Sequence, residues 1–106
     1  MASATNTAQQ LDRLIRGIVR GVDTEALTQV EKHALEQIRV ACNEVKLDVR
    51  DYEYAETRTE QLKWAKIGRH NLLALNKLLL SLGAIFGPAD IAECGAYIDS
   101  LQASLE

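Results

Sequence analysis

Aromatic residues and proline are scarce in this sequence. Trp64, Phe86 and three tyrosines are the only aromatic side chains, and Pro88 is the only proline. No stretch shows the alternation of β-branched and polar residues that is typical of a strand. A chain of 106 residues that draws its apolar content mainly from leucine and alanine favours helices. At this length we expect one all-α domain, with a flexible N-terminus over residues 1–7 and a single helical domain over residues 8–106.

An excess of positive charge is also missing, because the formal net charge is −3. A dedicated nucleic-acid-binding domain is expected to be strongly basic, so the balance argues against nucleic acid as the main partner. The first ten residues have neither the basic start nor the apolar run of a signal peptide. We therefore expect a cytoplasmic protein.

Motifs that carry chemistry are absent as well. The sequence contains no Walker-type loop, no GxGxxG and no GxSxG. Neither His33 nor His70 has a glutamate three positions before it, as the metal sites of helical bundles require. Cys42 and Cys94 form no CxxC motif and occupy apolar-periodic positions, which indicates inert, half-buried thiols. A disulfide between them, or a Cys–His pair that meets only in space, is the alternative. We expect no enzyme, no catalytic residue, no cofactor and no metal site.

Helical periodicity and capping patterns divide the chain into segments. Thr7 and Gln10 form a capping-box pattern before a first helix over residues 8–20, which Gly21 ends. Asp23 or Thr24 caps a long second helix of about thirty residues, because residues 23–60 contain neither glycine nor proline. Its apolar pattern lapses after residue 53. A second capping box, Thr57-x-x-Glu60, predicts a break there, and a continuous rod that runs on to residue 82 is the alternative.

The C-terminal part contains two further predicted helices. The third helix covers residues 60–82, with Gly83 as its C-cap. Gly87 and Pro88 then start a fourth helix, with Asp90 in its first turn. This last helix carries a regular apolar seam formed by Ile91, Cys94, Ile98, Leu101 and Leu105.

The third helix ends in an unusually apolar stretch, residues 71–91. A membrane span needs about 20 apolar residues, and Lys77 interrupts a shorter run, so no span is predicted. The short first and fourth helices leave much of the long second helix uncovered, which favours a second copy of the chain over a monomer that wraps its own leucines. We expect the coiled-coil-like interface of a homodimer to consist of Leu72, Leu75, Leu78, Leu79, Leu82, Ile85 and Phe86.

Charge is segregated along the chain. Residues 61–86 carry four bases and no acid, whereas residues 23–60 and 88–106 are acidic. In the structural interpretation, the basic third helix packs between acidic neighbours and its charges line the seams between them. In the functional interpretation, a basic patch with an aromatic residue binds an acidic partner or phosphate. Arg13, Arg16 and Arg20 line the polar face of the first helix, which is typical of a solvated face.

These observations favour an antiparallel helical bundle of three to four helices, one of them long, that forms a homodimer. The predicted function is a non-enzymatic oligomerisation or protein-interaction module, such as an adaptor, a regulator or an assembly factor. The alternative is a binder of nucleic acid or of another anionic ligand through the third helix. Aromatic and arginine side chains often anchor interfaces, although the aromatic ones here could also pack within the dimer. The predicted partner-binding residues are Tyr52, Tyr54, Arg58, Lys63, Trp64, Lys66 and Arg69.

Overall fold

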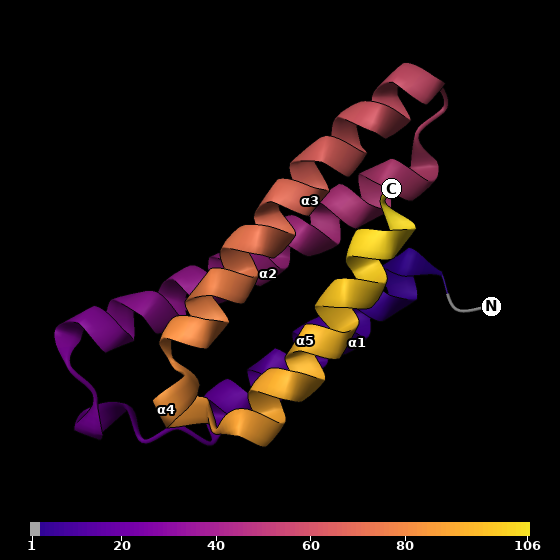
Figure 1. Ribbon diagram of the computed structural model, residues 1–106. Coiled ribbons are helices and arrows are strands. Elements are labelled where there is room, and N and C mark those ends of the chain that lie inside the picture. Colours follow the sequence, from indigo (N-terminus) through magenta and orange to yellow (C-terminus); the bar gives the residue numbers. More distant parts are fainter. Residues whose placement is uncertain (1–2) are drawn as a thin grey trace.

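The computed structural model describes residues 3–106, and these residues form five α-helices and one turn of 3-10 helix (Figure 1). No strand occurs among them, so the predicted all-α class is confirmed. The elements in chain order are α1 (Ala4–Arg20), η1 (Thr24–Ala26), α2 (Gln29–Tyr54), α3 (Arg58–Ser81), α4 (Gly83–Phe86) and α5 (Pro88–Ser104).

The first helix begins earlier than predicted. Ser3 is its N-cap, and the Ser3 hydroxyl accepts a hydrogen bond from the backbone N–H of Asn6 at 3.1 Å. The predicted start at residue 8 was wrong, because Ser3 is as good a cap as Thr7 and the earlier start adds contacts between Ala4 and the core. Residues 4–7, assigned to a flexible start, lie in the first turns of α1. The helix ends at Gly21, as predicted.

The second helix begins later than predicted, at a different capping box. Thr28 and Glu31 satisfy each other's backbone N–H groups at 3.1 and 2.9 Å. Asp23 instead caps the single turn η1, where its carboxylate accepts from the Glu25 N–H. The reciprocal pair at Thr28 satisfies two free donors and fixes the helix start there.

The predicted break near Thr57 is confirmed. α2 ends at Tyr54, and the Thr57 hydroxyl accepts from the Glu60 N–H at 3.1 Å to cap α3. The two helices therefore form an antiparallel hairpin. In Figure 1 they lie side by side along the long axis of the molecule, which measures 48 × 26 × 17 Å.

The chain reverses again after α3 in two steps. α3 ends at Ser81 with Leu82 as its C-cap, so the prediction of Gly83 in that role was wrong: Gly83 starts the one-turn helix α4. Gly87 then separates α4 from α5 with a φ of 85°, a conformation that favours glycine. Pro88 at the first position of α5 and Asp90 in its first turn agree with the prediction.

The four longer helices pack as antiparallel neighbours. Asp12 of α1 contacts Lys46 of α2, and the N–H of Thr5 near the start of α1 donates to Glu53 near the end of α2. The Arg69 guanidinium of α3 donates to the carbonyl of Leu105 just after α5, at 2.6 Å. α1 and α5 also pack against each other, and Figure 1 shows them side by side in opposite directions.

A close approach of three helices occurs around Gly68, which is buried in α3. A Cβ atom at this position would lie 2.9 Å from Leu105 Cδ1 and 3.5 Å from Asp48 Cβ. Glycine therefore lets α3 approach both α2 and the end of α5 at this level. No helix within residues 3–106 is long and apolar enough to cross a membrane.

Candidate functional site

The heptad seam of α3 is filled by the chain's own helices. Leu72 and Leu75 are completely buried, Leu79 is 2% exposed, and Leu82 and Phe86 are also buried. The predicted interface residues Leu78 and Ile85 are half-buried and pack against the same core. The single chain thus supplies the cover that the sequence analysis assigned to a second copy. The reason is that α2, α4 and α5 pack against α3, and the core that contains these leucines also includes side chains of α1.

The outward side of α3 carries a different set of leucines. Leu62, Leu73 and Leu80 are 53%, 55% and 58% exposed, and their spacings of three and two helical turns place them on one face. Lys66 and Lys77 are exposed on the same outward side. We call these five residues the α3 outer stripe. The predicted homodimer interface contains none of these three leucines, because it was limited to the heptad seam and one flank of the helix.

A second exposed apolar row runs along α2. Val40, Leu47 and Tyr54 are seven residues apart, and all three are large exposed hydrophobic residues. Glu36 and Glu44, one turn before and one turn after Val40, are also exposed. These five residues form the α2 outer stripe. It combines apolar side chains with acids, whereas the α3 outer stripe combines them with bases.

The predicted partner-binding residues divide into two groups. Tyr54, Arg58, Lys63 and Lys66 are exposed. Lys63 Nζ lies 5.0 Å from the Trp64 ring centroid, and Arg58 donates to Gln61 at 2.5 Å. Tyr52, Trp64 and Arg69 are half-buried: Tyr52 packs against the core, and the Arg69 guanidinium donates to the Leu105 carbonyl. Tyr52 and Arg69 therefore also stabilise the fold.

The ion pairs of residues 3–106 do not involve α3. They join Asp12 to Arg16 and Lys46, Glu36 to Arg39, and Asp51 to Arg50. The structural interpretation of the charge segregation, in which the bases of α3 line its seams, is therefore wrong for the lysines. Lys63, Lys66 and Lys77 are exposed, because the seams themselves are apolar.

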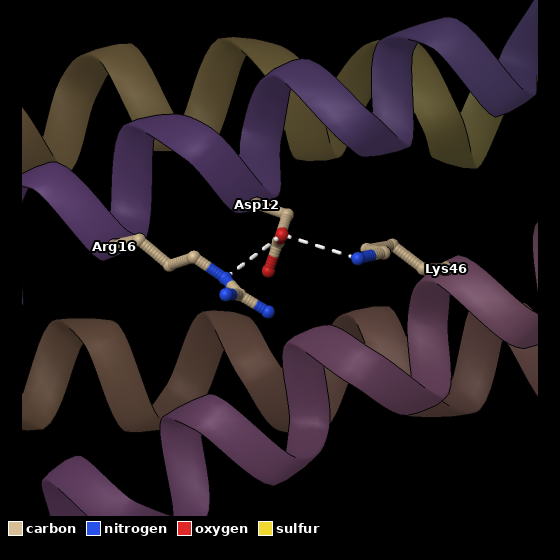
Figure 2. Close-up of polar contacts among 3 residues, drawn as sticks. All are labelled: Asp12, Arg16 and Lys46. Atoms are coloured by element: carbon tan, nitrogen blue, oxygen red, sulfur yellow. Dashed lines mark hydrogen bonds and ion pairs between the residues drawn. The ribbon is translucent and has the colours of Figure 1, made fainter.

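The best-connected polar centre lies between α1 and α2 (Figure 2). Asp12 is buried, with 8% of its surface exposed, and its Oδ2 atom accepts a hydrogen bond from Lys46 and forms an ion pair with Arg16. Arg16 Nε is 3.0 Å away, and Lys46 Nζ is 3.2 Å away. A buried carboxylate needs such partners to offset its lost hydration. Because Arg16 contacts Asp12 through Nε, its terminal nitrogens are left for other acceptors.

A groove opens beside this centre. It is lined by Asp12, Ile15, Arg16, Val19, Arg20, Arg39 and Cys42 and has a volume of about 420 Å³. Apolar residues and the buried Cys42 therefore share it with three arginines. We call it the α1–α2 groove. Sequence reasoning placed Arg16 and Arg20 on a solvated face, and no sequence signal could bring Arg39 of α2 next to them.

Asp48 is a second buried carboxyl, on the α3 side of α2. It is 3% exposed, and Asn71 Nδ2 donates to its Oδ2 at 2.6 Å. Burial raises the pKa of Asp48 above its ordinary value, the Asn71 hydrogen bond opposes that change, and nearby Glu44 and Asp51 add to it. This pair fixes the contact between α2 and α3 near Gly68.

The thiols of Cys42 and Cys94 are buried and form no disulfide, which agrees with the expectation of inert buried cysteines. Burial is the main cause that raises the pKa of Cys42 to about 12 and that of Cys94 to about 11. His33 and His70 are exposed. Within residues 3–106, no group of three or more histidine, cysteine, aspartate or glutamate side chains is placed to hold a metal ion.

Comparisons with protein-family models, with curated protein sequences and with solved structures find no match to this chain.

Proposed function

We propose that the protein is a non-enzymatic, cytoplasmic helical interaction module that forms a homodimer and acts by binding a partner protein. The observation that carries this proposal is the α3 outer stripe, in which three leucines on one helix face are more than half exposed. Single exposed leucines are common on protein surfaces. A row of them at helical spacing, flanked by lysines, is typical of a helix that receives another helix in coiled-coil fashion.

The chemistry of the α2 outer stripe fits this row. Its apolar residues recur every seven positions, and Glu36 and Glu44 provide charges opposite to those of Lys66 and Lys77. In a two-fold dimer, α3 of each copy would contact α2 of the other, so one favourable contact would occur twice. Flanking charges of opposite sign would fix the pairing, as they do beside coiled-coil seams. An amphipathic acidic helix on another protein would suit the same surface.

The first test is sedimentation velocity of the wild type and of the variant Leu73→Glu/Leu80→Glu, from low to high micromolar protein. We expect the wild type to form a dimer as concentration rises and the variant to stay monomeric, because each glutamate would have to be desolvated in the interface. Ala103→Glu, at an exposed position on α5, is the control and should dimerise like the wild type. A wild type that is monomeric at every concentration would exclude the homodimer.

A charge exchange tests which faces meet. Lys66→Glu/Lys77→Glu and Glu36→Lys/Glu44→Lys should each weaken self-association, since each places like charges opposite each other. A mixture of the two variants should form a heterodimer, because one interface then carries reversed charges and the other the original ones. If the mixture associates no better than either variant alone, α2 and α3 do not pair in this way.

The alternative function is binding of nucleic acid or another anion through α3. It is favoured by Lys63 and Lys66, which are exposed and make no ion pair within the described residues. Binding of a single-stranded oligonucleotide, measured by fluorescence anisotropy, should then weaken steeply with salt and in Lys63→Gln/Lys66→Gln. Oligonucleotide binding that is undetectable at low salt, or that is unchanged in the variant, would dispose of this alternative.

A further inference from the structure

The geometry points to the α1–α2 groove as a binding site for a small organic anion, one in which a phosphate or carboxylate group is joined to a compact apolar part. Its volume of about 420 Å³ lies within the range of small-molecule sites. The site is separate from both outer stripes, so this inference does not depend on the proposed dimer.

The cationic side of the groove has more donors than the protein uses. Arg16 contacts Asp12 only through Nε, and its side chain is 60% exposed. Arg39 makes one long contact of 3.4 Å with Glu36. Arg20 makes no ion pair within residues 3–106. A guanidinium group has five N–H donors in a planar fork that suits phosphate and carboxylate. Three arginines line the groove, against one acidic residue, Asp12, in a chain whose net charge is −3.

Asp12 lies in the lining of the groove and contacts a base from each of the two helices. Figure 2 shows its carboxylate between Arg16 on α1 and Lys46 on α2, with both bases directed at it. Lys46 balances the negative charge of Asp12, so a bound anion would not face an uncompensated carboxylate. We assign Asp12 as a positioning residue that orients the Arg16 guanidinium, in the way that outer-shell groups orient ligand-binding ones.

The apolar side of the groove sets the kind of anion. Ile15 and Cys42 are almost completely buried and form part of the lining together with the half-buried Val19. Burial raises the pKa of the Cys42 thiol to about 12, so this sulfur is neutral and does not repel an anion. Ile15 and Cys42 have little surface left to cover, so a bare inorganic ion would leave mainly the exposed part of Val19 in water. An anion with a compact apolar part would cover this surface and gain the free energy of its burial.

Titrations followed by ¹H–¹⁵N NMR, including the arginine Nε–Hε signals, test the site with phenyl phosphate, benzoate, inorganic phosphate and phenol as probes. We expect phenyl phosphate or benzoate to bind saturably, with shifts confined to residues 12–20 and 39–46. Inorganic phosphate has no apolar part and phenol has no anionic group, so each should bind at least about tenfold more weakly than phenyl phosphate. No saturable binding of either organic anion, or shifts spread over the surface lysines, would overturn the assignment.

Paired arginine variants supply the matched control. Arg20→Gln/Arg39→Gln should weaken the binding of phenyl phosphate by about tenfold or more, because hydrogen bonds to charged groups are lost. Arg13→Gln/Arg50→Gln removes the same charge from exposed positions on the same two helices outside the groove and should change the affinity by less than about twofold. Equal effects of the two variants would mean that the anion responds only to net charge, and the site would be rejected.

The variant Asp12→Asn separates simple charge attraction from orientation of Arg16, because the two explanations predict opposite changes in affinity. Asp12→Asn adds one positive charge, so simple attraction predicts tighter binding of phenyl phosphate. Loss of the Arg16 orientation predicts binding that is several-fold weaker. Thermal unfolding of the variant, followed by circular dichroism, establishes that it is folded at the titration temperature. Tighter binding in the folded variant would overturn the positioning role of Asp12.

Discussion

Two neighbouring leucines of α3 should respond very differently to truncation. Leu72 is completely buried in the core of the single chain, whereas Leu73 is 55% exposed. Leu72→Ala should lower the free energy of unfolding by about 2–5 kcal/mol, because it removes apolar contacts and leaves a cavity. Leu73→Ala should change it by no more than about 0.5 kcal/mol. For a domain whose total stability is about 5–15 kcal/mol, the first change is large and the second is barely measurable.

Urea unfolding followed by circular dichroism at low micromolar protein measures both values. An unchanged slope with urea in each variant would show that the same two states are compared. Leu79→Ala and Leu80→Ala repeat the contrast one heptad further along, since Leu79 is 2% and Leu80 is 58% exposed. Similar losses for Leu72 and Leu73, or a larger loss for Leu73, would refute the assignment of inner and outer faces.

Three further predictions concern glycine packing, a buried carboxyl and the thiols. Gly68→Ala should be less stable than Gly95→Ala by about 1–3 kcal/mol in urea unfolding. Both variants gain helix propensity, but only the new Cβ at position 68 would lie 2.9 Å from Leu105 Cδ1. Equal stability of the two variants would contradict this prediction. The raised pKa of Asp48 means that the folded state binds its proton more tightly than the unfolded state. The stabilising contribution of Asp48 is therefore lost as pH rises through its raised pKa. Over that pH range Asp48→Asn should gain stability relative to the wild type. A stability difference that does not change with pH would contradict this prediction. Cys42 and Cys94 should react with a thiol reagent at pH 8 only as fast as the protein opens, and at once in denaturant; rapid labelling of the native protein would show that they are accessible.

Local signals in the sequence predicted several helix boundaries, and the errors at the starts of the first two helices share one cause. Thr57 and Gly87 act as predicted, because capping and positive φ depend on a few adjacent residues. At the first two helices, the sequence offered competing caps of similar quality. Ser3 rather than Thr7 and Thr28 rather than Asp23 start α1 and α2, since tertiary packing and reciprocal hydrogen bonds decide between such candidates.

Which leucines of α3 are buried and which are exposed depends on how the helices are arranged in space. Periodicity identified the seam that includes Leu72 and Leu79, but it could not show whether other helices of the same chain or a second chain would cover it. Val30 and Tyr54, near the two ends of α2, are exposed, whereas the seam of α3 is covered. The α1–α2 groove was out of reach for the same reason, because Arg39 meets Arg20 only after α2 has folded back along α1.

The most direct measurement is urea unfolding of the Leu73→Glu/Leu80→Glu variant at a concentration where sedimentation finds only monomer. If each chain covers its own core and keeps its outward leucines for binding, this variant should unfold cooperatively, with a free energy within about 1 kcal/mol of that of the dilute wild type. A variant that has lost its cooperative transition, or that is unfolded when it is monomeric, would show that the leucines of α3 need a second molecule to form a core.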